Sequence, residues 1–105
     1  MAAWSGWHYL MLGGVLEIVW AACAKARPWW TLPISLAAGA GSVSCLYGAL
    51  ETVPIGTAYA VWTGIGAAGS ALVGILIFGE SANPARLASL GLVALGLVGI
   101  GLSTR

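Results

Sequence analysis

Residues 13–25 read GGVLEIVWAACAK and place one carboxylate, Glu17, near the middle of an apolar run long enough to cross a lipid bilayer. An ionisable side chain at membrane depth costs roughly 2.5–3.5 kcal/mol on insertion scales, so it usually faces a cavity or the interior of a helix bundle and marks a functional site. The alternative is a structural glutamate bonded to a neighbouring helix. We therefore interpret the rest of the chain as the surroundings of Glu17.

The composition is that of a membrane protein. Of 105 residues, 60% are hydrophobic and 7% are charged, whereas an average soluble domain has roughly 25% charged residues. The formal charge is +1 and no Lys/Arg cluster is present, which argues against nucleic acid as a partner. Cys23 and Cys45 lie in apolar runs without metal-ligand spacing, so we expect small buried residues and neither a disulfide nor a zinc site.

Four stretches are long and apolar enough to span a membrane, which takes about 20 residues. They cover approximately residues 7–26, 31–50, 54–78 and 86–103, and the breaks between them carry most of the remaining charges and prolines. Glu17 and the lack of a preceding Lys or Arg argue against a cleaved signal peptide. Because the connections are short, consecutive helices must be antiparallel neighbours. We predict an all-α membrane protein with a single four-helix transmembrane domain, residues 1–105.

The six tryptophans fall into two groups. Four lie at the ends of spans, where indole rings anchor at the headgroup level: Trp4, Trp7, Trp29 and Trp30. His8 belongs with them as a solvated end residue. Trp20 and Trp62 lie deep inside spans, where the indole N–H needs a partner that lipid cannot supply, so both are expected to point inward.

The Lys/Arg distribution sets only a weak orientation in the membrane. With four spans, Lys25, Arg27 and Arg86 lie on one side and Arg105 on the other, which favours termini on the outside. A chain with so small a bias can insert in both orientations. We therefore predict dual topology.

Helical spacing places small residues and one hydrogen-bond donor next to Glu17. Residues three and four apart share a helix face, so Gly13, Gly14 and Trp20 lie beside it. In the third span a similar stripe combines a hydroxyl, an indole N–H and aromatic rings; its members are Tyr59, Trp62, Thr63 and Gly66. Ser42 lies at comparable depth in the second span, and it either joins this site or bonds its own i−4 carbonyl.

These side chains suit a small organic cation. A carboxylate accepts two parallel N–H bonds from a planar guanidinium group, and aromatic faces attract cations. They also suit proton exchange, because the same carboxyl oxygen can hold either a proton or a cation. No nucleophile–base pair, metal cluster or phosphate loop is apparent in the sequence, so we expect no enzyme and no cofactor, with protons as the coupling ion.

Small residues in the last two spans predict bending or close packing. Gly64 and Gly66 indicate either a hinge that lets a cavity open alternately to each side or a tight helix contact. Residues 87–101 carry no ionisable group and a ladder of small residues typical of a packing surface, including Ser89, Gly96 and Gly99. Four helices are too few to gate a pathway around one central group. A homodimer, which would bring two copies of Glu17 together, is therefore expected.

The whole chain resembles the small multidrug resistance transporters, and within them the guanidinium-exporter subtype. The resemblance rests on four short spans, the glutamate in the first, and residues 54–66, which read PIGTAYAVWTGIG. Trp20, three residues after the glutamate, is typical of the guanidinium subtype, as are Thr57 and Thr63. The first connection, KARPWW at residues 25–30, is shorter than is usual in the family.

This resemblance implies an antiparallel homodimer of inverted subunits in the bacterial inner membrane, which exchanges protons for a guanidinium-type cation by alternating access. Carried over by position, Glu17 binds substrate and protons. The residues implied around it are Gly14, Trp20, Ser42, Tyr59 and Trp62, with bending at Gly64 to Gly66 and the dimer contact on the fourth span. Three alternatives remain: a broad exporter of quaternary ammonium and multidrug cations, one subunit of a paired heterodimeric exporter, or a non-transporting membrane scaffold.

Overall fold

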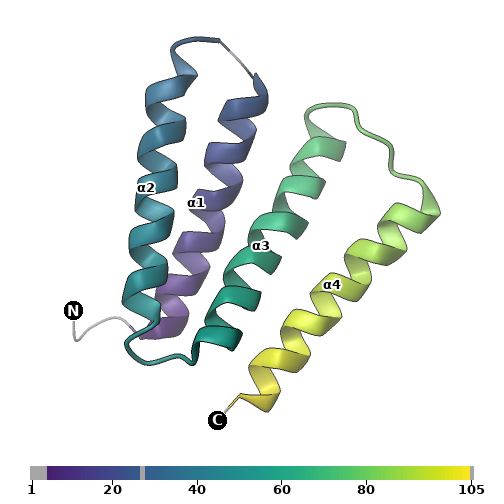
Figure 1. Cartoon of the computed structure of the whole chain (residues 1–105). Helices are drawn as coiled ribbons and strands as arrows, with labels where there is room; N and C mark the ends of the chain where they lie inside the picture. The colour runs from purple at the N-terminus through teal and green to yellow at the C-terminus, as the bar shows by residue number, and fades with distance from the viewer. Residues whose placement is uncertain (1–4, 27, 105) are drawn as a thin grey trace.

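The computed structural model describes residues 5–26 and 28–104, and within this part the chain forms four helices (Figure 1). They are α1 (Gly6–Ala26), α2 (Thr31–Ala49), α3 (Ile55–Leu76) and α4 (Pro84–Ser103). Each helix is long and apolar enough to cross a membrane. The prediction of an all-helical chain with four such spans is confirmed. Trp4, Arg27 and Arg105 lie outside the described residues, so the interfacial role of Trp4 and the orientation bias stay predictions.

The ends of α3 and α4 differ from the expected bounds for local reasons. α3 ends at Leu76 and not near residue 78, because the chain turns at Gly79, whose φ of 69° suits glycine, and the Glu80 N–H donates to the Gly74 carbonyl at 3.0 Å. α4 begins at Pro84 and not at residue 86. Asn83 caps it by accepting the Arg86 N–H at 2.8 Å, and proline is favoured at the first helical position.

The helices are arranged around α1. α1 lies against both α2 and α3, whereas among the described helices α4 lies beside α3 only (Figure 1). The start of α1, the α2–α3 connection and the end of α4 share one end of the molecule. A buried apolar cluster forms at that end from α1, α2, α3 and the α2–α3 connection, and its members are Leu10, Ala49, Val53, Ala58, Val61 and Trp62.

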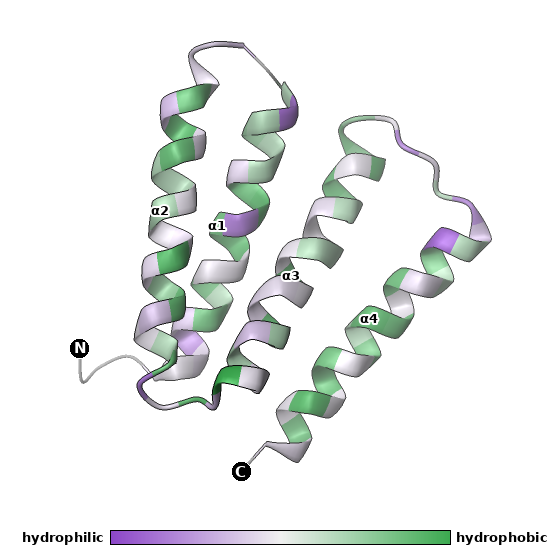
Figure 2. Ribbon diagram, in the orientation of Figure 1, coloured by the Kyte–Doolittle hydropathy of each residue, from purple (hydrophilic) through white to green (hydrophobic). Residues whose placement is uncertain are grey.

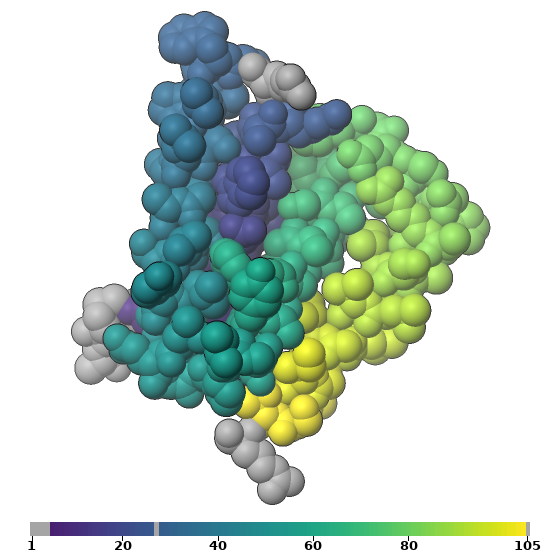
Figure 3. Space-filling view, in the orientation of Figure 1, coloured from purple at the N-terminus to yellow at the C-terminus, as the bar shows by residue number. Residues whose placement is uncertain are grey.

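α4 is the outermost helix and contributes no buried residue. Figure 2 shows that it is largely apolar along its length, and in the space-filling view it forms one side of the molecule, opposite α2 (Figure 3). A Cβ added at Gly96 or Gly99 would meet no atom within 4 Å, and the Ser89 hydroxyl donates within its own helix to the Ala85 carbonyl at 2.8 Å. The predicted packing residues of the fourth span therefore face away from this chain.

Anchoring of the span-end tryptophans at the headgroup level stays a prediction, and Trp7, near the start of α1, packs against the buried cluster while partly exposed. Trp29 and Trp30 are exposed at the α1–α2 connection, and His8 is exposed near the start of α1 with its ring 2.9 Å from the Ser5 hydroxyl. Both cysteines are free thiols; Cys45 is buried and Cys23 is partly buried.

Candidate functional site

Glu17 lies near the middle of α1 and is half-buried. The indole Nε1 of Trp20, one turn further along the helix, donates to Glu17 Oε1 at 2.8 Å. A carboxylate offers about four lone-pair positions on its two oxygens, so one indole N–H leaves capacity for further donors. Trp20 retains 38% exposure. It is therefore part of the wall of an open site and not a residue of the core.

Glu17 and Trp20 open onto a groove of about 510 Å³ between α1 and α2. Apart from these two residues and Ser35, the lining consists of apolar side chains and one glycine: Ala24, Leu32, Leu36, Gly39, Ala40 and Val43. A hydrogen bond or charge pair is stronger beside apolar walls than in bulk water, because the local dielectric constant is lower. The groove therefore combines one carboxylate with conditions that favour pairing it with a cation.

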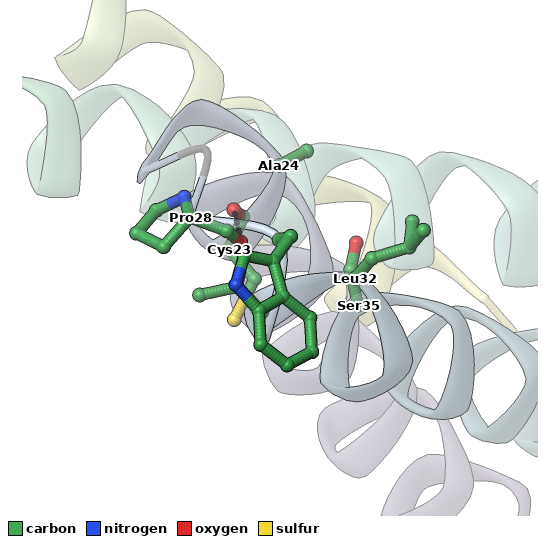
Figure 4. Close-up of a pocket in the computed structure, with 7 residues that line it drawn as sticks. Cys23, Ala24, Pro28, Leu32 and Ser35 are labelled. Carbon is green, nitrogen blue, oxygen red and sulfur yellow. Dashed lines mark hydrogen bonds between the residues drawn. The ribbon is translucent and has the colours of Figure 1, made fainter.

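A second hollow, of about 330 Å³, continues from this groove toward the α1–α2 connection. Figure 4 shows Cys23 and Ala24 from α1 on one side, Leu32 and Ser35 from α2 on the other, and Pro28 from the connection. The two hollows share Ala24, Leu32 and Ser35. Ser35 therefore lies where they meet.

α3 approaches Glu17 through Gly66. A Cβ added at Gly66 would lie 3.0 Å from the Cβ of Glu17 and 3.8 Å from its Oε2, so even alanine would press on the carboxylate residue. Gly64 faces α4 in the same way, with a Cβ there in contact with Leu97. α3 is continuous through both glycines. In this conformation both serve close packing, and bending at Gly64 and Gly66 stays a prediction.

Ser42 and Trp62 form a buried connection that joins three helices. The Ser42 hydroxyl donates to the Gly13 carbonyl of α1 at 2.7 Å and accepts the Trp62 indole N–H of α3 at 2.8 Å, and Ser42 is fully buried. In an α-helix the Gly13 carbonyl also accepts the N–H of Glu17, so this connection holds the turn that carries the carboxylate. The alternative that Ser42 bonds its own i−4 carbonyl is wrong, and Ser44 makes a bond of that kind.

Tyr59 and Gly14 lie at the margins of the site. The Tyr59 ring packs at a tilt against Trp62, with centroids 5.6 Å apart, and the side chain is 56% exposed. Gly14 is buried, and a Cβ there would lie 2.5 Å from the side chain of Ile65 in α3. It allows α1 and α3 to approach closely and does not line the groove.

The predicted site residues therefore divide into two groups connected through the backbone of α1. One group, Glu17 with Trp20, faces the groove. The other group consists of the buried Ser42 of α2 and Trp62 of α3, with the exposed Tyr59 beside Trp62. Within residues 5–26 and 28–104, no three His, Cys, Asp or Glu side chains gather where they could hold a metal ion.

Two hydroxyl residues of α2 that the sequence analysis did not single out also face α1. Ser35 donates to the Trp20 carbonyl at 2.9 Å, and the Thr31 hydroxyl lies 2.7 Å from the Pro28 carbonyl and 3.1 Å from the Cys23 carbonyl. A sequence signal for them exists, because small residues recur along α2 at alternating steps of four and three, and the structure buries each of them: Thr31, Ser35, Ala38, Ser42, Cys45 and Ala49. This is the face of α2 that meets α1.

The fold and the site together define a class of protein. Four apolar helices make the chain a multi-pass membrane protein, and Glu17 lies at mid-helix beside an open groove. A carboxylate kept at membrane depth usually serves the passage of ions or polar solutes. We therefore place the chain among small membrane transporters.

The chain belongs to the small multidrug resistance family, whose model, described as Small Multidrug Resistance protein, matches residues 5–93. The guanidinium exporters of Citrobacter freundii and Salmonella typhimurium are each 52% identical to it over 102 residues, which cover 93% of this chain and 97% of theirs. The guanidinium exporter of Escherichia coli K12 is 48% identical over the same lengths. The resemblance inferred from the sequence is therefore confirmed.

Proposed function

We propose that this protein exports guanidinium and small guanidinyl compounds in exchange for protons, at a site centred on Glu17. The observation that carries the proposal is a half-buried carboxylate at mid-helix, held by the Trp20 indole at 2.8 Å and open to a groove. Relatives named guanidinium exporters, at 48% to 52% identity over nearly their whole length, support the same substrate.

A planar guanidinium ion fits this carboxylate chemically. Its N–H groups form a rigid fork that can donate two parallel hydrogen bonds to the two oxygens. Trp20 already bonds Oε1, which fixes the rotation of the carboxylate and so the directions of the lone pairs left for the cation. The face of an indole ring attracts cations as well.

Proton coupling follows from two occupants that share one carboxyl group. A protonated Glu17 lacks the charge that attracts guanidinium, and a bound guanidinium uses the oxygens that a proton would take. If the site crosses the membrane only when occupied, the two species must move in opposite directions. A proton gradient then drives the cation out, with protons as the coupling ion and no cofactor.

The working unit in this proposal is an antiparallel homodimer of inverted subunits. α4 has no buried residue, and Gly96 and Gly99 have open space around them, so this face suits a second copy of the chain. Two copies of Glu17 would then share one pathway. Bending of α3 at Gly64 and Gly66 would open that pathway to each side in turn.

The test is guanidinium uptake into liposomes driven by an outward proton gradient. We expect uptake by the wild type, none by Glu17→Gln, and residual activity in Glu17→Asp, because aspartate keeps the charge on a shorter side chain. Glu51→Gln is the matched control, since Glu51 is exposed in the α2–α3 connection. A fully active Glu17→Gln variant would rule out the mechanism.

The apolar wall of the groove favours a second candidate, a broad exporter of quaternary ammonium and other multidrug cations. Leu32, Leu36 and Val43 offer apolar contact without hydrogen-bond acceptors on their side chains. A bulky cation without N–H donors separates the two, because losing the donors weakens only a site built on hydrogen bonds. Equal transport of tetraethylammonium and guanidinium would favour the broad exporter. A requirement for a second, different chain would make this protein one subunit of a paired exporter.

A further inference from the structure

Hydroxyl groups of α2 hold the backbone of α1 in a fixed register. Ser35 donates to the Trp20 carbonyl at 2.9 Å, and Ser42, seven residues later, donates to the Gly13 carbonyl, seven residues earlier, at 2.7 Å. Equal steps in opposite directions are what an antiparallel helix pair requires. Each such bond has a single acceptor, so the pair cannot slide or rotate without breaking it.

The bond of Ser35 is distinguished by its acceptor. It is the carbonyl of Trp20, the residue whose indole binds Glu17 Oε1. Ser35 is 7% exposed and lines the same groove as Glu17 and Trp20. A continuous series of bonds therefore runs from a buried hydroxyl of α2, through the backbone and then the side chain of Trp20, to the carboxylate.

We propose that Ser35 is a positioning residue for the Glu17 site. It fixes the turn of α1 from which Trp20 projects, so that the indole N–H stays aimed at the carboxylate and the remaining lone pairs stay aimed into the groove. Displacements well below 1 Å matter for such a constellation. The inference rests on the proposed function, but the bond between the Trp20 indole and the Glu17 carboxylate can be measured without a transport assay.

Kinetics of guanidinium uptake by the full chain in liposomes give the first readout. We expect Ser35→Ala to raise the KM for guanidinium by about threefold or more, with a smaller change in maximal rate, because one interhelical hydrogen bond is lost. Ser35→Thr keeps the hydroxyl and is expected to restore KM. The matched control is Ser44→Ala, because the Ser44 hydroxyl lies on the same helix but bonds its own helix, at the Ala40 carbonyl. If Ser35→Ala and Ser44→Ala have the same KM for guanidinium, the proposal is contradicted.

A double-mutant cycle with Trp20→Phe separates positioning from general packing. Phenylalanine has no indole N–H, so in that background Ser35→Ala should change the KM by a factor close to one. If Ser35 only helped the helices to pack, the two fold-changes would multiply. A double variant whose fold-change in KM equals the product of the two single fold-changes would therefore overturn the proposal.

The nuclear magnetic resonance signal of the Trp20 indole N–H gives a readout that needs no transport. Its disappearance in Trp20→Phe assigns it, and we expect it to shift in Ser35→Ala but not in Ser44→Ala. An unmoved signal in a folded Ser35→Ala protein would refute the positioning role. A shifted signal together with no guanidinium uptake by the wild type would refute the proposed function instead.

Discussion

Ser42→Ala removes the hydroxyl that joins α1, α2 and α3. The resulting loss in the free energy of unfolding can be estimated from the two hydrogen bonds that this hydroxyl makes. Ser42 is fully buried and Trp62 is 9% exposed, so the Trp62 indole N–H would stay buried without its acceptor. An unpaired buried donor costs about 1–3 kcal/mol. Losing the bond to the Gly13 carbonyl adds about 0.6 kcal/mol, the average for interhelical hydrogen bonds in membranes. We expect the free energy of unfolding to fall by about 2–4 kcal/mol.

The assay is equilibrium unfolding in mixed micelles with increasing dodecyl sulfate, followed by helical circular dichroism so that no tryptophan is needed as a probe. Trp62→Phe removes the donor, and in the double variant with Ser42→Ala no indole N–H remains to be left unpaired. The double variant should therefore lose less stability than the sum of the two single variants. Ser44→Ala, a change on the exposed face of α2, should stay within about 0.5 kcal/mol of the wild type. A Ser42→Ala variant inside that same margin, or strict additivity, would refute the reasoning.

Three further predictions concern the site and the proposed dimer. Gly66→Ala places a Cβ 3.0 Å from that of Glu17 and should lower kcat/KM for guanidinium roughly three- to tenfold in liposome uptake, whereas Gly56→Ala, with nothing within 4 Å, should not. The proposed competition of protons and guanidinium for Glu17 predicts that the guanidinium affinity of the wild type, measured by binding titration, falls as the pH is lowered; an affinity that does not change with pH would contradict a shared site. If α4 forms the contact of the proposed dimer, Gly99→Leu should lower the dimer fraction measured by light scattering without loss of helix content, and an unchanged dimer fraction would exclude α4 as the contact.

Local sequence relations predict this fold and part of the site. Span lengths and apolar runs are properties of single helices, so four helices follow from the sequence alone. The bond between Trp20 and Glu17 also lies within one helix, where three-residue spacing puts the two side chains on one face. Both features depend on neighbours along the chain and need no knowledge of how helices dock.

Contacts between helices are the part that the sequence left open. The acceptor of Ser42 is 29 residues away, and choosing it over the i−4 carbonyl requires the register of α1 against α2. The register of α1 against α3 decides in turn that Gly14 lies against Ile65 and not beside the groove. The end of α3 was misplaced for a different reason, since the turn at Gly79 depends on a backbone conformation that hydropathy does not report.

The hydroxyl bonds between α2 and α1 also bear on how the protein is made. Ser35 and Ser42 find their acceptors within the first half of the chain, before α3 and α4 are needed. A nascent hairpin of α1 and α2 can therefore settle in the membrane with these polar groups satisfied while the ribosome is still translating the remainder. The Trp62 indole, which is translated later, would then meet a hydroxyl whose own proton is already bonded.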